Sequence, residues 1–315
     1  MTVIQMKFRA KPEALGLMRE KTLFAYMHEL VAQFQTLGRE RSAETYTAAL
    51  KSFYRYRNGQ DLPLADLDES VVVGYESYLR TTGLTMNTSS FYMRVLRAAY
   101  NRAVGKGYTI QRSPFKHVYT GVDKTAKRAV SIRKIRQIKE LDLSARPDLA
   151  LARDMFLFSF YTRGMSLIDM MYLTPANLCG GRLVYSRRKT GQYLSVRWEH
   201  CMQEIVDRYR PASSYYLLPL ISVPGVDERR QYRNRSGWIR LKLRTIGEMV
   251  RLDVPLTMYV ARHSWASIAR VSNVPVSVIS EGMGHDSERT TQIYLSSLDY
   301  IAVDKANRRL IQLLR

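Results

Sequence analysis

A histidine and a tyrosine lie close together near the C-terminus, in the stretch GHDSERTTQIYLSS. Tyr294 follows His285 by nine residues. A tyrosine oxygen can act as a nucleophile, and a histidine can carry a proton or donate a hydrogen bond, so the pair is a candidate for covalent catalysis. The alternative interpretation is a packed aromatic residue beside a surface histidine. The rest of the chain has to decide between the two.

Three further groups in the second half of the chain have side chains suited to phosphate chemistry. They are Arg163 in YTRGMSLIDM, Lys189 in RRKTG, and the pair Arg262-His263 in TMYVARHSWA. Arginine forks pair with phosphate oxygens, and a lysine can protonate a departing oxygen. Each also has an ordinary role: Arg163 as an ion-pair partner of Asp169, Lys189 as an exposed turn residue, Arg262 as a helix anchor.

The overall charge favours a polyanionic partner. The 315 residues include 49 Lys and Arg against 28 Asp and Glu, a net charge of +21. Such an excess on a folded chain indicates nucleic acid before a membrane surface, with a generically basic protein as the alternative. The two cysteines, Cys179 and Cys201, lack metal-ligand spacing and are expected to be reduced thiols. We expect neither a metal nor a cofactor.

Two basic stretches predict where phosphates are contacted. Lys124–Lys139 and Arg229–Arg244 each contain seven Lys or Arg and no acidic residue. We interpret the first as a strap along the phosphates rather than a solvated linker, and the second as another basic face. The residues expected to contact DNA are Lys124, Lys127, Arg128, Arg133, Lys134, Arg233, Arg235 and Arg240.

The first part of the chain reads as a small helical domain. Apolar residues recur at helical spacing from Leu23, and Gly38 ends that run. Further helices are predicted from Ser42, after Asp68, and after a cap at Asn87-Thr88. These four helices would occupy residues 20 to about 118.

The second part is predicted to be mostly helical with a small β element. An apolar helix covers LARDMFLFSFY, and LVYSRRKTGQYLSV reads as two strands with a turn at Thr190-Gly191. The fold class is therefore mainly α with a small antiparallel β element (α+β). The expected parts are an arm 1–20, a helical domain 21–120, a basic linker 121–135, and a second domain 136–315 that ends in an amphipathic helix.

Over nearly its whole length the chain resembles the tyrosine recombinases, also called phage-type integrases. The stretch NTSSFYMRVLRAAYNRAVGKGYTIQRSPF is similar to the end of the family's SAM-like core-binding domain. The family's R-x-K-T-G is present as Arg187 to Gly191, and its arginine-histidine pair as Arg262-His263. Its Gly-His is Gly284-His285, and its tyrosine follows in TTQIY.

The resemblance implies a reaction and a role for each residue. Tyr294 would attack a DNA phosphorus and form a 3′-phosphotyrosyl link, with Arg262 clamping the phosphate. Lys189 is then the general acid for the 5′ oxygen, and His285 hydrogen-bonds the phosphate. His263 assists with the tyrosine proton. Neither metal nor ATP is needed, because the phosphotyrosyl link stores the bond energy.

Two positions depart from the family pattern. Tyr259 stands where the family usually has a histidine, and a tyrosine can still hydrogen-bond a phosphate. Ser166 stands where the first arginine of G-L-R-x-S-E belongs. Arg163 lies three residues upstream and would share a helical face with that position. We favour Arg163 as the substitute; Arg187 or Arg188, or a slow or inactive enzyme, are the alternatives.

The resemblance also implies partners and a setting. We expect site-specific binding of double-stranded DNA, a homotetramer on DNA, and DNA-bending accessory proteins, in the bacterial cytoplasm and away from membranes. The C-terminal helix either packs on its own domain or docks into a neighbouring protomer. Two rival functions remain open: a catalytically impaired DNA-binding architectural protein on the same fold, and a type IB topoisomerase-like strand-relaxing enzyme.

Overall fold

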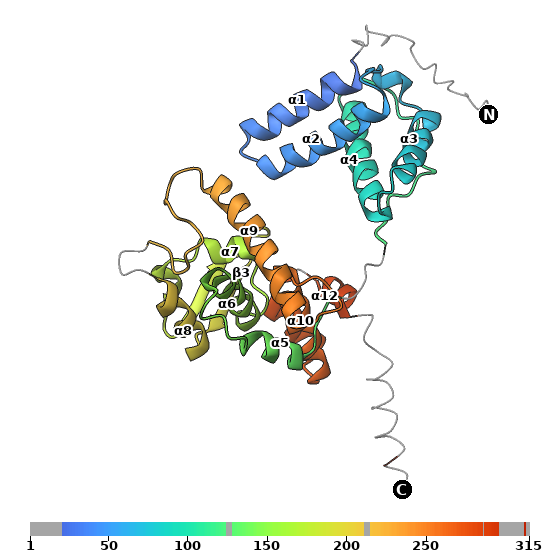
Figure 1. Cartoon of the computed structure of the whole chain (residues 1–315). Helices are drawn as coiled ribbons and strands as arrows, with labels where there is room; N and C mark the ends of the chain where they lie inside the picture. Colours follow the sequence, from blue (N-terminus) through green and yellow to red (C-terminus); the bar gives the residue numbers. More distant parts are fainter. Residues whose placement is uncertain (1–20, 124–127, 211–214, 286, 296–311, 313–315) are drawn as a thin grey trace, which may run out of the picture. The chain divides into compact units, whose positions relative to one another are not determined.

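The structure, a computed structural model, describes residues 21–123, 128–210, 215–285, 287–295 and 312. The chain divides into two compact units, Met1–Thr125 and Ala126–Arg315. Helices dominate both units, and the second also holds a small antiparallel sheet (Figure 1), which confirms the predicted fold class. None of the described helices is long and apolar enough to cross a membrane.

The first unit is built around an aromatic core. Tyr75 is fully buried, its ring meets Phe53 edge to face at 4.8 Å, and its hydroxyl donates to Ser52 at 2.7 Å. These aromatic contacts hold the helices of the first unit together around a core with few polar groups. They are α1 Leu23–Thr36, α2 Glu40–Tyr56, the 3-10 turn η1 Leu64–Asp66, α3 Glu69–Thr81 and α4 Met86–Gly105.

The first residues of α2 and α3 agree only partly with the prediction from the sequence. Asp68 caps α3 as predicted, because its carboxylate accepts the N–H of Val71 at 3.0 Å. The second helix begins at Glu40, after Arg39, rather than at Ser42. Gly38 has a left-handed backbone conformation, which turns the chain sharply after α1. The second helix can therefore begin almost at once after the turn.

The cap of α4 was misplaced by sequence reasoning. The N-cap is Thr85, whose hydroxyl accepts the N–H of Thr88 at 3.3 Å. Asn87 instead bonds both backbone groups of Asp123, at 2.7 and 3.0 Å. A long-range contact has therefore claimed the side chain that local pattern assigned to capping.

The second unit packs around α6. Residues Met155, Phe156 and Phe158 of this helix are fully buried, as expected for its apolar sequence. The elements of the unit are α5 Ile132–Lys139, α6 Pro147–Tyr161, α7 Leu167–Met171, η2 Pro175–Asn177, β1 Leu178–Cys179, β2 Arg182–Ser186, β3 Tyr193–Arg197, α8 His200–Tyr209, α9 Glu228–Met249, α10 Met258–Val271, α11 Val276–Met283 and α12 Glu288–Leu295.

The sheet has the order β1-β2-β3 and is antiparallel throughout. The β2–β3 hairpin confirms the two predicted strands, with Tyr185 opposite Leu194. Its loop is closed by the N–H of Gly191 on the carbonyl of Arg187, at 2.7 Å. The short β1 strand was not predicted, because two residues carry no alternation to read.

The basic stretch after the first unit becomes structured earlier than expected. It was assigned as a linker to residue 135, but α5 begins at Ile132, and Ile135 and Ile138 are buried in the second core. Ahead of α5, the N–H of Val130 donates to the hydroxyl of Ser264 on α10 at 2.9 Å. Lys124 and Lys127 lie outside the described residues, as do the 1–20 arm and nearly all of the predicted C-terminal helix.

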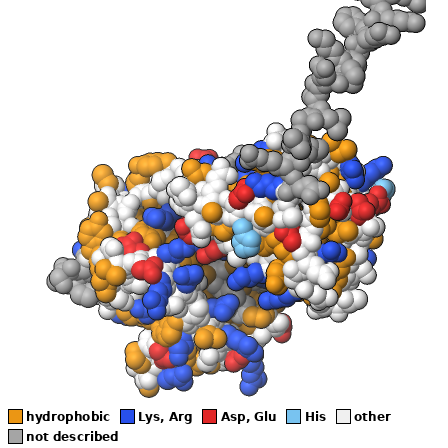
Figure 2. Space-filling model, turned by 90° about the horizontal axis from the view of Figure 1, so that it is seen from above, with side chains coloured by type: hydrophobic (Ala, Val, Ile, Leu, Met, Phe, Trp, Pro, Cys, Tyr) orange, Lys and Arg blue, Asp and Glu red, His pale blue; other side chains and the backbone are white. Residues whose placement is uncertain are grey.

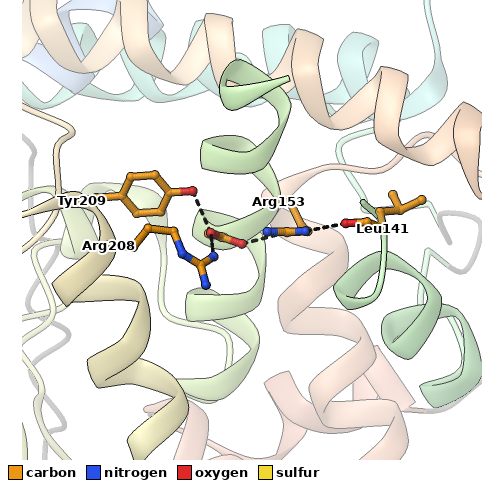
Figure 3. A network of polar contacts seen from close by, with 5 residues as sticks. Leu141, Arg153, Arg208 and Tyr209 are labelled. Carbon is orange, nitrogen blue, oxygen red and sulfur yellow. Dashed lines mark hydrogen bonds and ion pairs between the residues drawn. The ribbon is translucent and has the colours of Figure 1, made fainter. Parts of the chain in front are cut away.

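A buried carboxylate ties several segments to α6 (Figure 3). Asp154 is 2% exposed and accepts from Arg153 at 2.8 Å and from the hydroxyl of Tyr209 at 2.7 Å. Arg208 also donates to it, and Arg153 reaches the carbonyl of Leu141 at 2.7 Å. The network joins α8 and the α5–α6 loop to the central helix α6.

Candidate active site

Arg262 is held by three partners from two separate segments of the chain. One terminal nitrogen donates to the carbonyl of Gly164 at 2.9 Å. The other donates to the carbonyl of Met283 at 2.7 Å and meets Nε2 of His285 at 2.9 Å. These contacts join α10 to the end of α11 and to the loop after α6, so the plane of the guanidinium is set before any ligand arrives.

The partners of His285 determine its tautomer. A guanidinium only donates, so Nε2 of His285 accepts from Arg262. The proton then sits on Nδ1, which donates to the hydroxyl of Thr291 at 2.7 Å. His285 is therefore neutral in this arrangement, and Thr291, fully buried on α12, sets the orientation of the ring.

A glycine makes the contact between Arg262 and the α6–α7 loop possible. Gly164 has a φ of +78°, and a Cβ there would lie 2.6 Å from the Cα of Arg262. Only glycine fits both the backbone and the space. The loop can thus place its carbonyl directly against α10.

Arg163 reaches the same region, but not by the route inferred from sequence. It is followed by Gly164, and both have positive φ, so α6 has ended and no helical face links Arg163 to Ser166. The Arg163 side chain lies against α11 instead: a Cβ on Gly282 would sit 3.5 Å from its Cδ. Ser166 caps α7 and donates to Asp169 at 2.6 Å.

Arg187 reaches the end of α11 from the hairpin. One of its terminal nitrogens donates to the carbonyl of Gly284. Gly284 has a φ of +63°, and a Cβ there would approach Gln192 to 2.8 Å and the Cδ of Arg187 to 3.0 Å. The glycine before His285 is thus required for this close packing, which gives the Gly-His pair a structural reason.

The neighbouring residues of the hairpin face elsewhere. The N–H of Arg188 donates to Asp169 at 2.9 Å, and its guanidinium lies 3.7 Å from the centre of the Tyr172 ring. Arg188 is therefore engaged by an aromatic face away from α11. Lys189 is exposed in the loop between the strands.

The three arginines share one electrostatic environment around Tyr185 of β2. Burial raises the pKa of this tyrosine, and the Asp169 carboxylate raises it further. The charges of Arg187, Arg262 and Arg163 act in the opposite direction and lower the pKa. All three guanidinium groups therefore act on the same buried hydroxyl.

Tyr259 and His263 form an aromatic pair on α10. Their ring centres lie 4.3 Å apart in an edge-to-face arrangement, and Tyr259 is 43% exposed. Burial lowers the pKa of His263 to about 4, helped by the charges of Arg128 and Arg262. The imidazole is therefore neutral at physiological pH.

Tyr294 lies in α12, which packs on α10 and α11. Leu295 is buried against Ala266, Ile279 and Met283. The backbone of the tyrosine is thus positioned over the two helices that carry Arg262 and precede His285, while its side chain lies outside the described part of the structure.

The residues expected to contact DNA divide into exposed and engaged groups. Arg128, Arg133, Arg233 and Arg240 are exposed. Arg235 stacks 5.4 Å from the centre of the Trp238 ring. Lys134 donates to the carbonyl of Val250 at 2.7 Å, so its ammonium serves the fold. Figure 2 shows Lys and Arg side chains in several groups over the visible face.

Some of the groups that build this site were missed by sequence reasoning. Thr291 lies within TTQIY, and its hydroxyl could have been recognised from the sequence as a hydrogen-bonding partner for His285. The carbonyls of Gly164, Met283 and Gly284 have no sequence signal, since every residue carries a carbonyl. Among the described residues, no group of three or more His, Cys, Asp or Glu could hold a metal ion.

Comparison with known proteins bears on the fold. Residues 22–120 match the family described as Phage integrase SAM-like domain. No curated protein sequence matches the chain significantly. Among solved structures, a lambda integrase dimer bound to a COC′ core site superposes with a TM-score of 0.67 at 14% identity, covering 89% of this chain and 97% of that one.

Two further structures give similar values. A lambda integrase tetramer bound to a Holliday junction has a TM-score of 0.68 at 14% identity, covering 88% of this chain and 78% of that one. The Tn1549 transposon integrase in complex with transposon right end DNA has a TM-score of 0.65 at 13% identity, covering 92% and 100%. The chain therefore contains a phage integrase SAM-like domain and has a fold similar to that of lambda integrase and of the Tn1549 transposon integrase.

Proposed function

We propose that the chain is a site-specific DNA recombinase that cuts and rejoins strands through a 3′-phosphotyrosine intermediate on Tyr294. The observation that carries the proposal is the arrangement of Arg262, His285 and Arg187 around the end of α11, immediately before the helix that holds the tyrosine. The guanidinium groups of Arg262 and Arg187 carry positive charge in fixed positions, which suits the negative charge that develops on a phosphate under attack.

The reaction is a transesterification in two reversible steps. The Tyr294 oxygen attacks phosphorus, the bond from phosphorus to the 5′ oxygen breaks, and the phenol proton passes to His263, which is neutral. Lys189, on the exposed hairpin loop, gives its proton to the departing 5′ oxygen. The 5′ hydroxyl of another strand then reverses both transfers and seals the junction.

The arginine missing at Ser166 has two candidate substitutes in the proposed site. Arg163 packs against α11, and Arg187 is bonded to the carbonyl before His285. We assign the role to Arg163, which lies three residues before Ser166 and against α11. If Arg163→Ala cleaves as fast as wild type while Arg187→Ala does not, the role belongs to Arg187.

The proposed partners follow from the charge and from the relatives. The similar structures include a lambda integrase dimer on a core site and a tetramer on a Holliday junction. We infer that this chain binds double-stranded DNA sites and forms a tetramer when two sites are brought together. Binding should weaken steeply with salt, because phosphate contacts release counterions.

Covalent trapping tests the proposal. Wild type is mixed with nicked suicide duplexes drawn from the DNA that flanks the gene, and a denaturant-resistant protein–DNA band is sought. Tyr294→Phe should lose the band, while Tyr300→Phe, six residues further on, should keep it.

The outcomes separate the proposal from its two rivals. Site-specific binding without a band would favour the architectural protein, with Ser166 as the cause of inactivity. Relaxation of plasmids that lack any specific site would favour the topoisomerase reading.

A further inference from the structure

A second wall of the Arg262 region is formed by α9. A cavity of about 290 Å³ opens between α9, the start of α10 and the loop after α6. Its polar lining is supplied by Ser166, Tyr232, Ser236, Arg240, Thr257, Tyr259 and Arg262. Ser166, where the resemblance leads one to expect an arginine, therefore shares a cavity with another arginine, Arg240.

The geometry of α9 directs Arg240 to this cavity. Tyr232, Ser236 and Arg240 are spaced by four residues, so they follow one face of the helix, and all three line the cavity. Arg240 is exposed, and among the described residues its guanidinium makes no hydrogen bond or ion pair. Arg244, one turn further, contacts Glu248 at 3.2 Å and does not line the cavity.

The start of α10 adds two features that suit an anion. The first turn of a helix has N–H groups without intrahelical acceptors and a partial positive charge. Here that turn, Met258 and Tyr259, lines the cavity. The hydroxyl oxygen of Thr257 is buried and has no hydrogen-bond partner among the described residues, although it too lines the cavity.

We propose that Arg240 contacts the scissile phosphate from the α9 side, beside Ser166 and Arg262, and adds a donor to the one assigned to Arg163. The phosphate lies in the cavity at the start of α10 and accepts from Thr257. The inference rests on the proposed strand-cleavage function for its DNA substrate. The binding of an oxyanion between the two arginines does not depend on activity and can be tested separately.

Arginine modification tests the oxyanion site in the full chain. Phenylglyoxal labels accessible arginines, and mass spectrometry reports each position, with inorganic phosphate present or absent. Phosphate should slow labelling of Arg240 about tenfold or more and leave Arg244 unchanged, since only the first lines the cavity. The protection should disappear in Arg262→Ala.

Equal labelling of Arg240 with and without phosphate would overturn the proposal. So would protection that persists in Arg262→Ala, because the two arginines would then not share one ligand. Both results judge Arg240 whether or not the protein cleaves DNA, so they are distinct from a failed covalent trap.

Single-turnover cleavage then asks whether the ligand is the DNA phosphate. Arg240→Ala should cleave roughly 100-fold slower than wild type, and Arg244→Ala at the wild-type rate. A methylphosphonate at the scissile position removes one negative charge, so it should restore the Arg240→Ala rate to within a few-fold of wild type on that substrate. A structural defect would not be rescued, and the absence of rescue would refute direct contact.

Discussion

The arginines around α11 and the arginines on the basic surface differ in how firmly their side chains are held. Arg262 and Arg187 donate to main-chain carbonyls at the end of one helix. Arg133 and Arg240 extend from α5 and α9 with exposed side chains. The first pair is oriented before a phosphate arrives, while the second must lose side-chain freedom on binding.

This difference assigns different work to the two regions. Oriented donors stabilise a charge that develops at one atom, and they should matter for the rate of cleavage. Exposed donors meet any backbone phosphate, and they should matter for affinity and its dependence on salt. Arg240 is the intermediate case, because it is exposed yet lines the cavity with Arg262.

Gly164→Ala should break the oriented region most severely. The added Cβ would lie 2.6 Å from the Cα of Arg262, on a backbone with φ of +78°. We expect a loss of about 3 kcal/mol in the free energy of unfolding and loss of the covalent trap. Gly180→Ala is the matched control: its φ is +57° but the space around it is empty, so about 1 kcal/mol is expected. Equal losses for the two variants would contradict the proposed packing.

Thr291→Val should loosen the oriented region without dismantling it. The substitution removes the acceptor of the His285 Nδ1 proton while keeping the shape of a fully buried side chain. Cleavage should fall about tenfold in single-turnover assays, because the ring loses its fixed tautomer. Thr290→Val changes an exposed neighbour and should cleave normally. An unchanged cleavage rate for Thr291→Val would mean that cleavage does not depend on the orientation of His285 by Thr291.

Arg133→Ala and Lys134→Ala sharpen the contrast within α5. Arg133 is exposed, so its loss should reduce the slope of log affinity against log salt by about 0.9 and leave stability unchanged. Lys134 donates to the carbonyl of Val250 at 2.7 Å, so its loss should cost about 1 kcal/mol of stability and spare the slope. Binding at several salt concentrations and urea unfolding measure both. If the two variants changed the salt slope and the stability equally, Arg133 and Lys134 would not have different roles.

A pH-dependent effect on stability is expected at His263. Its pKa falls from 6.5 to about 4 because burial and the charges of Arg128 and Arg262 disfavour the protonated ring, which otherwise faces Tyr259. Between these values the unfolded chain binds a proton that the folded chain does not, so the free energy of unfolding falls as pH drops from about 6.5 to about 4.

Urea unfolding at a series of pH values checks this prediction. His263→Gln should show a shallower fall over that window than wild type, whereas His200→Gln, at a side chain 87% exposed, should not differ. The same slope in all three proteins would mean that His263 does not resist protonation in the fold.

Local patterns predicted most of the fold. The apolar run of α6 and the alternation around Thr190-Gly191 correctly indicated a buried helix and a hairpin. The errors fell where distant groups compete with local ones. Asn87 bonds Asp123 rather than its own helix, and Ile135 and Ile138 draw the basic stretch into the core as α5. A local reading cannot weigh such contacts, because their partners are far away in sequence.

The candidate site was predicted in part. Residue types and spacing indicated the pairs Arg262-His263 and Gly284-His285. The helical-face argument for Arg163 was wrong, since two successive residues of positive φ end α6 before Ser166. Arg163 nevertheless lies against α11, for a reason that required the packed structure.

The sequence by itself determined the helical and strand periodicity, the excess of positive charge, and the residue types able to perform phosphoryl transfer. These depend on side-chain chemistry and on short-range spacing, which are written directly in the chain. Only the tertiary structure decided which arginines meet at the end of α11, which tautomer His285 adopts, and that Arg240 shares a cavity with Arg262. These arrangements depend on hydrogen bonds to main-chain carbonyls and on close contacts between segments far apart in the chain. The sequence does not reveal either of them, because every residue carries a carbonyl and the contacts form only on folding.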